Sequence, residues 1–248
     1  MLGALERIRD RVLDAATIAP GETVADVGTG LGLIALGAVG RVGPGGDVLA
    51  LDVSVDCLEE LRRVARAPNL AFLIGDATVL PLTDASVDVV VTRSVLMYVR
   101  ERDEAAREFA RVLRSDGRVS IFEPINRRLQ PLSEAIDFGD DTALVSGWEA
   151  GRLERDDPML SFDEHDLERM FRGAGLAEVH VDVDVQELPL GAESLLTVPG
   201  APGAQPLFER WCAEHGEEVA ARLAARVREH DEPIVLRLPT AHLVARKP

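Results

Sequence analysis

The chain has 248 residues, of which 46% are hydrophobic and 28% charged, a composition that is ordinary for a globular protein with one sizeable core. Its formal net charge of -16 at pH 7 repels a phosphate backbone, which argues against an enzyme that modifies DNA or RNA. No apolar run approaches the roughly 20 residues of a membrane span, and residues 1–11 carry charges throughout, so we expect a cytoplasmic protein without membrane partners.

The first predicted element is a helix over residues 2–17, because Leu5, Ile8 and Val12 recur at helical spacing. Pro20-Gly21 then ends the helix and leads into a strand. We expect this element to serve as a lid or as a packing helix beside the sheet that follows.

The next stretch, Val24 to Gly32, is a short apolar run that closes on three glycines at every second position. It predicts a strand, a tight turn and the start of a helix. Glycine lets the backbone turn sharply and approach a ligand, and the open helix N-terminus supplies unpaired N–H groups, so a small molecule is expected across the turn. Asp26 shares a strand face with Gly28, and its carboxylate would repel a pyrophosphate but attract an ammonium or sulfonium cation.

The spacing Asp-x-Gly-x-Gly-x-Gly from Asp26 to Gly32 resembles the first motif of the class I S-adenosylmethionine (SAM) dependent methyltransferases. It differs from the dinucleotide-binding pattern Gly-x-Gly-x-x-Gly. A glycine turn that only lets the helix and the strand pack closely is the alternative interpretation of this motif.

Asp52 directly follows a second predicted strand, Asp47 to Leu51, and precedes a helix that Ser54 can cap and that runs to about Arg66. In a doubly wound sheet, an acidic side chain about 20 residues past the glycine turn accepts hydrogen bonds from ribose hydroxyls. The spacing places Asp52 there, although an acid that caps the helix is the alternative. Because SAM and NAD both carry a ribose, Asp52 does not separate the two cofactors.

The third predicted strand, Leu70 to Ile74, ends in Gly75-Asp76-Ala77. This segment resembles the one in which a methyltransferase Asp accepts the adenine amino group and the next backbone N–H meets the ring, roles that would fall to Asp76 and Ala77. Gly-Asp also forms an ordinary turn, so this segment alone is weak evidence. It supports the resemblance because it is the third match in order, after Asp26 and Asp52, at the end of a predicted strand.

The fourth predicted strand, Val87 to Thr92, is almost continuously apolar, as a buried parallel strand should be, and the segment Arg93 to Tyr98 follows it. In the methyltransferases that the chain resembles, this segment faces the reacting methyl group. It lacks the Asn/Asp-Pro-Pro-Tyr signature of many enzymes that methylate amino groups of nucleic acids and proteins. Tyr98 is expected either to line the substrate pocket or to belong to the core.

A predicted helix, Glu104 to Leu113, is closed by Ser115-Asp116-Gly117 and leads into a fifth strand, Arg118 to Phe122, which ends at Glu123. The segment Arg111 to Arg118 resembles the helix-to-strand turn of small-molecule methyltransferases. The resemblance therefore extends from the first strand to Glu123.

Beyond the fifth strand the pattern is less regular. Ile125 to Leu160 has little periodicity, and a stretch of that length inside a compact domain is more often a functional lid than a linker. The remaining expected elements are a helix that Ser161 or Asp163 caps and that runs to Arg172, a strand from Ala177 to about Val185, an irregular insertion from Glu187 to Gly203, a mixed-charge helix from Leu207 to Arg228 and a final strand from Ala241 to Ala245.

The resemblance implies an α/β fold with a Rossmann-like doubly wound sheet of seven strands in the order 3-2-1-4-5-7-6, the seventh antiparallel. The ligand crevice is expected at the carboxyl ends of the strands, beside the first. We expect a single SAM-dependent methyltransferase domain over residues 1–248. The helix over 2–17 and insertions at 125–160 and 187–230 would act as its lid or substrate-specificity elements.

The same resemblance implies that SAM is the cofactor and that its methyl group passes to an oxygen, nitrogen or carbon atom of a small-molecule acceptor. The residues expected at the cofactor are Asp26, Gly28, Thr29, Gly30, Gly32, Asp52, Val53, Asp76, Ala77, Arg93 and Ser94. A general base is optional, because positioning and the removal of water can supply most of the acceleration. The candidate bases are Tyr98, Glu123 and His165, although His165 lies in a first helical turn, where polar residues also serve as caps.

Two alternatives remain open. An NAD(P)-dependent reductase would share Asp52 and the sheet, but the chain has no Tyr-x-x-x-Lys pair, because Lys247 is its only lysine. A non-catalytic SAM-binding or scaffold protein would keep the cofactor site without turnover. We predict no metal, since the acidic run Asp137 to Asp141 lacks companion ligands, and Cys57 and Cys212 lack metal spacing.

Overall fold

The computed structural model describes residues 2–200 and 203–248, so Met1, Ala201 and Pro202 of the expected single domain lie outside the described residues. The described residues form a seven-stranded sheet in the order β3-β2-β1-β4-β5-β7-β6, in which β7 pairs antiparallel with β5. The predicted α/β class, strand order and antiparallel seventh strand are confirmed.

The first five strands run parallel to one another. The strands are β1 (Thr23–Val27), β2 (Asp47–Asp52), β3 (Leu70–Ile74), β4 (Val87–Arg93), β5 (Leu113–Pro124), β6 (Ala177–Leu190) and β7 (Ile234–Arg246). Because β1 to β5 are parallel, their carboxyl ends meet at one edge of the sheet, and the loops that follow them gather there.

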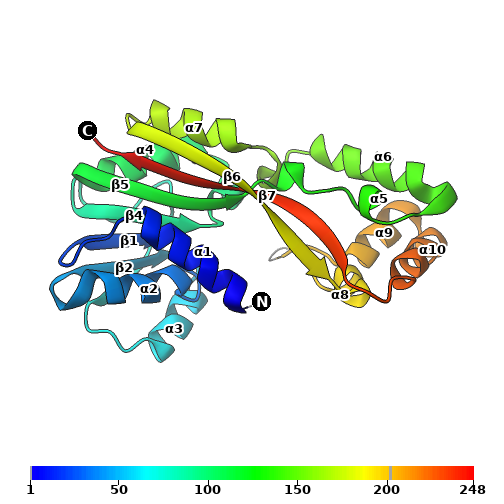
Figure 1. Cartoon of the computed structure of the whole chain (residues 1–248), viewed down its shortest axis with the longest axis horizontal. Coiled ribbons are helices and arrows are strands. Elements are labelled where there is room, and N and C mark those ends of the chain that lie inside the picture. The colour runs from blue at the N-terminus through cyan, green and yellow to red at the C-terminus, as the bar shows by residue number, and fades with distance from the viewer. Residues whose placement is uncertain (1, 201–202) are drawn as a thin grey trace. The chain divides into compact units, whose positions relative to one another are not determined.

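Helices cover both faces of the sheet in the first of two compact units, which comprises residues up to 125 together with 158–184 and 240–248. One face carries α1 (Leu2–Ala15), α2 (Leu33–Val42) and α3 (Val55–Val64), and the other carries α4 (Arg102–Val112) and α7 (Glu164–Gly173) (Figure 1). Each face of the sheet has its own hydrophobic core. Val24 packs in the core beneath α1, α2 and α3, and Ala25 packs in the core beneath α4 and α7, because successive strand residues point to opposite faces.

β5 begins at Leu113 instead of the predicted Arg118. The segment Ser115-Asp116-Gly117, predicted to be a closing turn, lies inside the strand, where the pairing with β4 shifts register between Val87 and Val89. Asp116 has a φ of 63°, a left-handed conformation that suits a bulge. The turn-forming residues were therefore recognised correctly, but they bend a strand instead of ending it.

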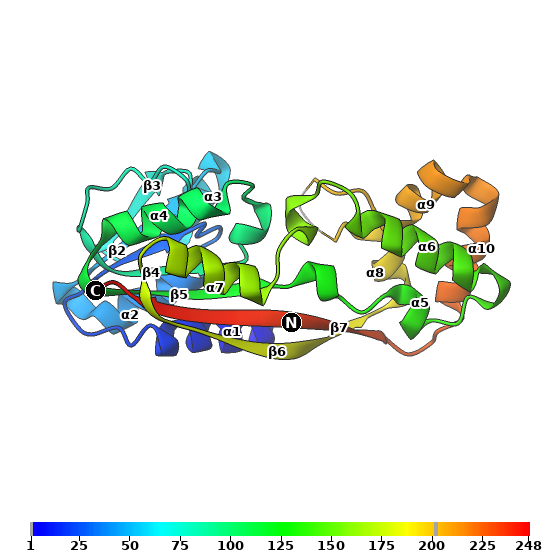
Figure 2. The ribbon, with the colours of Figure 1, turned by 90° about the horizontal axis from the view of Figure 1, so that it is seen from above.

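The second compact unit comprises residues 126–157 and, apart from the two residues not described, 185–239. It contains α5 (Leu132–Ala135), α6 (Thr142–Leu153), α8 (Ala192–Thr197), α9 (Leu207–His215) and α10 (Glu217–Arg228) (Figure 2). Its hydrophobic core contains Phe138, Trp148 and Trp211. The ring centres of Phe138 and Trp148 each lie 6.1 Å from that of Trp211. Much of the two stretches expected to be irregular is thus helical, and their role as lid or specificity elements stays a prediction.

Single turns of 3-10 helix complete the secondary structure. They are η1 (Gly43–Gly45), η2 (Leu96–Tyr98), η3 (Asn126–Arg128), η4 (Gly139–Asp141) and η5 (Pro158–Leu160).

The long helix predicted from Leu207 to Arg228 is two helices that meet at Gly216. This residue has φ 85° and ψ 161°, a region that is essentially open only to glycine. The charged residues of α10 are exposed, while Ala220, Leu223 and Val227 are buried on its other face. The amphipathic pattern was continuous in the sequence, but the backbone is not.

A pair of glycine substitutions tests this junction. Gly216→Ala should lower the free energy of unfolding by about 1–3 kcal/mol, because alanine is strained in that conformation. Gly147→Ala, inside α6, should instead raise it by about 0.5–1 kcal/mol. A Cβ at either position meets nothing within 4 Å, so only the backbone conformation differs. Denaturant unfolding measures the free energy of unfolding of both variants. Equal changes in the two would contradict the glycine-only backbone conformation at Gly216.

Candidate active site

The three glycines of the turn after β1 meet different surroundings. All have positive φ, at 69° for Gly28, 53° for Gly30 and 83° for Gly32. A Cβ on Gly28 would lie 2.2 Å from Cγ2 of Val95, and one on Gly32 would lie 2.3 Å from Cδ1 of Leu61. A Cβ on Gly30 would meet nothing within 4 Å. Gly28 and Gly32 are therefore packed against the protein, whereas Gly30 leaves open space for a ligand to approach the backbone.

Asp26 lies beneath this turn and is only 1% exposed. Its Oδ2 accepts hydrogen bonds from Thr29 Oγ1 at 2.7 Å and from Ala35 N at 2.9 Å. Burial raises the pKa of Asp26 to about 7, against the lowering effect of these two bonds. Asp26 and Thr29 therefore tie the turn to the start of α2, and their contact with a cofactor stays a prediction.

Asp52, at the end of β2, reaches across to the glycine turn. Its Oδ2 accepts a hydrogen bond from Gly30 N at 2.8 Å, and its Oδ1 accepts one from Ser54 N at 2.9 Å. The N-cap of α3 is Ser54, whose side chain accepts from Cys57 N, and Asp52 accepts from the backbone of that N-cap residue. The two interpretations of Asp52, as a ribose acceptor and as a further capping acid, both stay predictions. The Asp52 carboxylate joins two strand ends at the open side of the turn.

Large apolar side chains lie exposed around the same strand ends. Their exposed fractions are 65% for Leu31, 65% for Val53, 62% for Ile74, 72% for Val79 and 47% for Tyr98. Leu31 follows β1, Val53 follows β2, Ile74 ends β3, and Tyr98 lies just beyond β4. Exposed apolar surface that gathers at one edge of a sheet is characteristic of a binding site.

Asp76 and Ala77 follow β3, as predicted. Asp76 is exposed, and its Oδ1 accepts hydrogen bonds from Thr78 N at 2.8 Å and Thr78 Oγ1 at 2.7 Å. These bonds from Thr78 lower the pKa of Asp76 below its ordinary value. Ala77 is 6% exposed, so its side chain packs inward while the Asp76 carboxylate lies at the surface.

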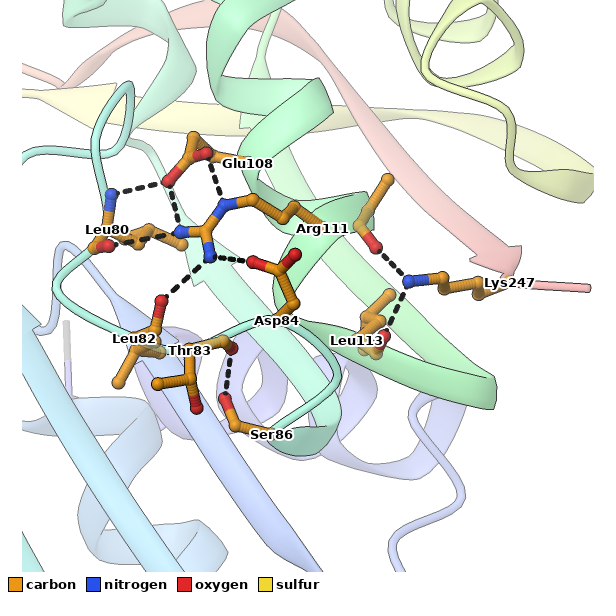
Figure 3. A network of polar contacts seen from close by, with 10 residues as sticks. Leu80, Leu82, Thr83, Asp84, Ser86, Glu108, Arg111, Leu113 and Lys247 are labelled. Atoms are coloured by element: carbon orange, nitrogen blue, oxygen red, sulfur yellow. Dashed lines mark hydrogen bonds and ion pairs between the residues drawn. The ribbon is translucent and has the colours of Figure 1, made fainter.

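The loop beyond Asp76 is fixed by a side chain that the sequence interpretation did not single out. Arg111, on α4, forms two bonds of 2.7 Å with Glu108 and one of 2.7 Å with Asp84 (Figure 3). It also donates to the carbonyl oxygens of Leu80 and Leu82, while Leu80 N donates to Glu108. The spacing of Glu108 and Arg111 by three helical residues was the available signal, because it places both on one face.

The only lysine of the chain completes the same region. Lys247 Nζ donates to the carbonyl oxygens of Ala110 and Leu113, each at 2.7 Å, at the end of α4 (Figure 3). Those carbonyls lack helical partners, so the ammonium group caps the helix.

Arg93 and Ser94 lie where β4 ends. Ser94 has a φ of 55°, and its N donates to Phe122 O at 2.8 Å, so the chain turns sharply away from the sheet there. The pKa of Tyr98 is raised by burial and by Glu123, and the Arg93 guanidinium opposes that rise. Arg93 also lowers the pKa of Asp26, as the smallest of several influences there. These charges therefore face one region at the ends of β1 and β4.

The three candidate bases lie in different environments. Glu123 is 0% exposed and accepts three backbone hydrogen bonds, so its carboxylate is committed to the protein. His165 is exposed in the first turn of α7, and its N donates to Asp163, which caps that helix in a capping box. Tyr98 is exposed and is not a core residue. Of the three candidates, Tyr98 presents its side chain at the strand ends.

Residues 2–200 and 203–248 hold no group of three His, Cys, Asp or Glu side chains that could bind a metal ion. Within those residues, no helix is both long enough and apolar enough to cross a membrane.

Comparison with known families matches the part of the chain that contains this site. A family model described as a methyltransferase domain matches residues 25–121. An arsenite methyltransferase of Halobacterium salinarum is 33% identical over 156 residues, which are 62% of this chain and 39% of that protein. A demethylmenaquinone methyltransferase of Renibacterium salmoninarum is 36% identical over 122 residues, which are 49% of each. The chain therefore spans less than half the length of these curated relatives.

Solved structures share the fold over nearly the whole chain. The YcgJ protein of Bacillus subtilis has a TM-score of 0.63 at 18% identity, with 96% of this chain and 97% of that one covered. A structure described as a putative methyltransferase from Bacillus halodurans has a TM-score of 0.60 at 19% identity, with 97% and 98% covered. At this level of identity the likeness concerns the fold.

The geometry of the turn predicts different effects for two of its glycines. Gly28→Ala and Gly30→Ala both place alanine at positive φ, but only the first meets a neighbour, Val95, at 2.2 Å. Gly28→Ala should therefore lower the free energy of unfolding by about 1–3 kcal/mol more than Gly30→Ala, through overpacking. Chemical denaturation of the ligand-free variants measures the difference, and equal losses would contradict the contact.

Proposed function

Residues 25–121 belong to the methyltransferase-domain family, in its class I, SAM-dependent form, and we propose that the chain transfers the methyl group of SAM to a small-molecule acceptor. The observation that carries the proposal is the contact between Gly30 N and the Asp52 carboxylate at the open side of the glycine turn. It joins the first two cofactor motifs in space, although 22 positions separate them in the sequence.

Each of these residues has a proposed part in binding. Asp52 accepts the ribose hydroxyls, since each carboxylate oxygen has further lone pairs beside its bond to Gly30 or Ser54. Asp76 accepts the adenine amino group, and the exposed Val53 and Ile74 cover the faces of the ring. Gly30 lets the backbone approach the cofactor without a side chain between them.

When bound, SAM supplies a methyl group already activated by its sulfonium, so the chain's residues need mainly to orient the reactants and exclude water. Arg93 is placed to pair with a carboxylate, either that of the cofactor's methionine part or that of the acceptor. Glu123 is committed to three backbone bonds, and His165 belongs to a capped helix end. Tyr98 is exposed at the strand ends, and because its pKa is raised, its phenol is protonated at neutral pH, so its proposed part is to donate a hydrogen bond to the acceptor and not to act as a base.

The proposed acceptor is an organic molecule with an oxygen, nitrogen or carbon nucleophile. The arsenite methyltransferase among the relatives acts on a soft metalloid, and soft species prefer thiolate ligands. The two cysteines here are Cys57 on α3 and Cys212 on α9, which belong to different compact units. Neither unit offers a pair of thiols, which favours an organic acceptor over arsenite.

The second compact unit is proposed to determine which acceptor binds. It lies outside residues 25–121, the part that the methyltransferase-domain family shares. It includes most of the insertions expected at 125–160 and 187–230, and it has a core of its own. Residues 25–121 would thus supply the methyl-transfer chemistry that the family shares, and the second compact unit would supply the specificity for the acceptor.

The role of Asp52 can be tested by calorimetric titration with SAM. Asp52→Ala should lose roughly 1.5–3 kcal/mol of affinity, about ten- to a hundredfold, because two ribose hydroxyls lose their acceptor. Asp163→Ala is the matched control, since it removes a carboxylate that caps α7, and it should bind SAM nearly as the parent does. If Asp52→Ala kept the parent affinity and Asp163→Ala lost it, the proposed site would be wrong.

Limited proteolysis tests the proposed role of the second unit. SAM together with an accepted substrate should slow cleavage within residues 125–160 relative to the free chain, as expected of an element that orders around its ligand. Mass spectrometry of the fragments locates the cuts. Equal cleavage rates with and without saturating ligands would count against the proposal, and absence of labelled methyl transfer to every acceptor tried would favour a non-catalytic SAM-binding protein.

A further inference from the structure

Glu123 holds the segment that follows β4 by three backbone hydrogen bonds. Its Oε1 accepts from Val95 N at 2.8 Å and from Leu96 N at 2.9 Å, and its Oε2 accepts from Met97 N at 3.2 Å. The side chain is 0% exposed, so water does not compete for these donors. A carboxylate at the end of β5 thus takes three consecutive N–H groups that would otherwise be buried without acceptors.

The same segment is also held from α4 and packed against the glycine turn. Arg102 Nε donates to Leu96 O at 2.8 Å, and its guanidinium lies 4.6 Å from the centre of the Phe162 ring. Val95 occupies the space beside Gly28, where a Cβ would lie 2.2 Å from Cγ2 of the valine. The position of Glu123 is therefore transmitted through Val95 to the turn at which the cofactor is proposed to bind.

We propose that Glu123 is a positioning residue, which sets cofactor affinity by fixing Val95 against the glycine turn and is not a general base. This inference rests on the proposed function, since it assigns a role within the same site. This proposal replaces the predicted role of Glu123 as a catalytic base. The carboxylate binds the backbone of residues 95–97, and the position of that backbone determines how well the cofactor binds.

The charge state of Glu123 gives this role a measurable signature. Burial raises the pKa of Glu123 to about 7, against the lowering effects of its three N–H donors and of Arg102. Other charged or titratable groups near it are Arg93 at the end of β4, Tyr98 beyond β4, and His242 on β7, whose neighbour Ala241 pairs with Glu123. Below its pKa the carboxyl group carries a proton, which takes up acceptor capacity facing the three N–H donors.

Stability and affinity should then respond to pH in opposite directions. The pKa of Glu123 lies above its ordinary value of 4.5, so ionisation costs folding stability as pH rises from there to about 7. Cofactor affinity should rise over the upper part of that range, because the ionised carboxylate holds the segment best. A merely structural carboxylate would change stability and leave affinity unchanged.

The test is calorimetric titration with S-adenosylhomocysteine at about pH 6 and about pH 8, one unit on each side of this pKa. The parent should bind about tenfold more tightly at the higher pH. Glu123→Gln keeps one acceptor oxygen but is neutral at both values, so it should bind weakly at both. Asp26, whose pKa is also raised to about 7, titrates in both proteins and leaves the difference between them unaffected.

Asp88→Asn serves as the control. Asp88 accepts from Thr23 N and pairs with Arg114 at the amino ends of the strands, away from the glycine turn. This variant should keep the parent's affinity and pH dependence. Val95→Ala leaves the carboxylate in place but removes the valine methyl groups that lie beside Gly28, so this variant should lose both cofactor affinity and its pH dependence. If Glu123→Gln does not fold, Val95→Ala tests the proposal in its place.

A folded Glu123→Gln with the parent's affinity and pH dependence overturns the inference, and so does a Val95→Ala that binds as the parent does. A parent chain that binds no S-adenosylhomocysteine at either pH overturns the proposed function, and this inference with it. The two failures are thus distinguishable in one set of titrations.

Discussion

Carboxylates that accept backbone N–H groups hold this site together. Asp26 accepts from Ala35 N, Asp52 from Gly30 N and Ser54 N, and Glu123 from three residues beyond β4. Parallel strands release their loops at one edge, and those loops carry N–H groups that no strand partner satisfies. Acidic side chains at the strand ends satisfy them, and the loops become a fixed surface as a result.

The proposed cofactor carries a ribose and a flat ring, and this surface presents an acceptor and apolar side chains that would suit them. Gly30 leaves the backbone open, Asp52 stands beside it, and Val53 and Ile74 expose apolar surface nearby. The loop beyond β3 is held by Arg111, which bonds to side chains and carbonyl oxygens on both sides of it. A ligand that meets such preformed loops loses little affinity to ordering them.

The sequence predicted the features that depend on local pattern. The strands follow from hydrophobic runs and Asp52 from its spacing to the glycines, whereas the strand order and Asp76 were implied by the family resemblance. The structure confirms the strand order, and it has Asp52 at the end of β2 and Asp76 just after β3. Glu123 was predicted at the end of the fifth strand as one of three candidate bases, but its three backbone N–H donors were not predicted, because they lie 26 to 28 positions away in the chain. The break at Gly216 was missed, because the amphipathic pattern continues through it. The backbone conformation at one glycine, and hydrogen-bond donors far away in the chain, cannot be predicted from the pattern of a single sequence.

The central claim is that SAM binds where the glycine turn meets the Asp52 carboxylate. A crystal structure of the chain with S-adenosylhomocysteine tests it most directly. The account predicts the ribose hydroxyls on Asp52, the ligand backbone beside Gly30 and the adenine between Val53 and Ile74. A ligand bound elsewhere, or an Asp52 carboxylate that stays on Gly30 N and Ser54 N without touching the ribose, would contradict it.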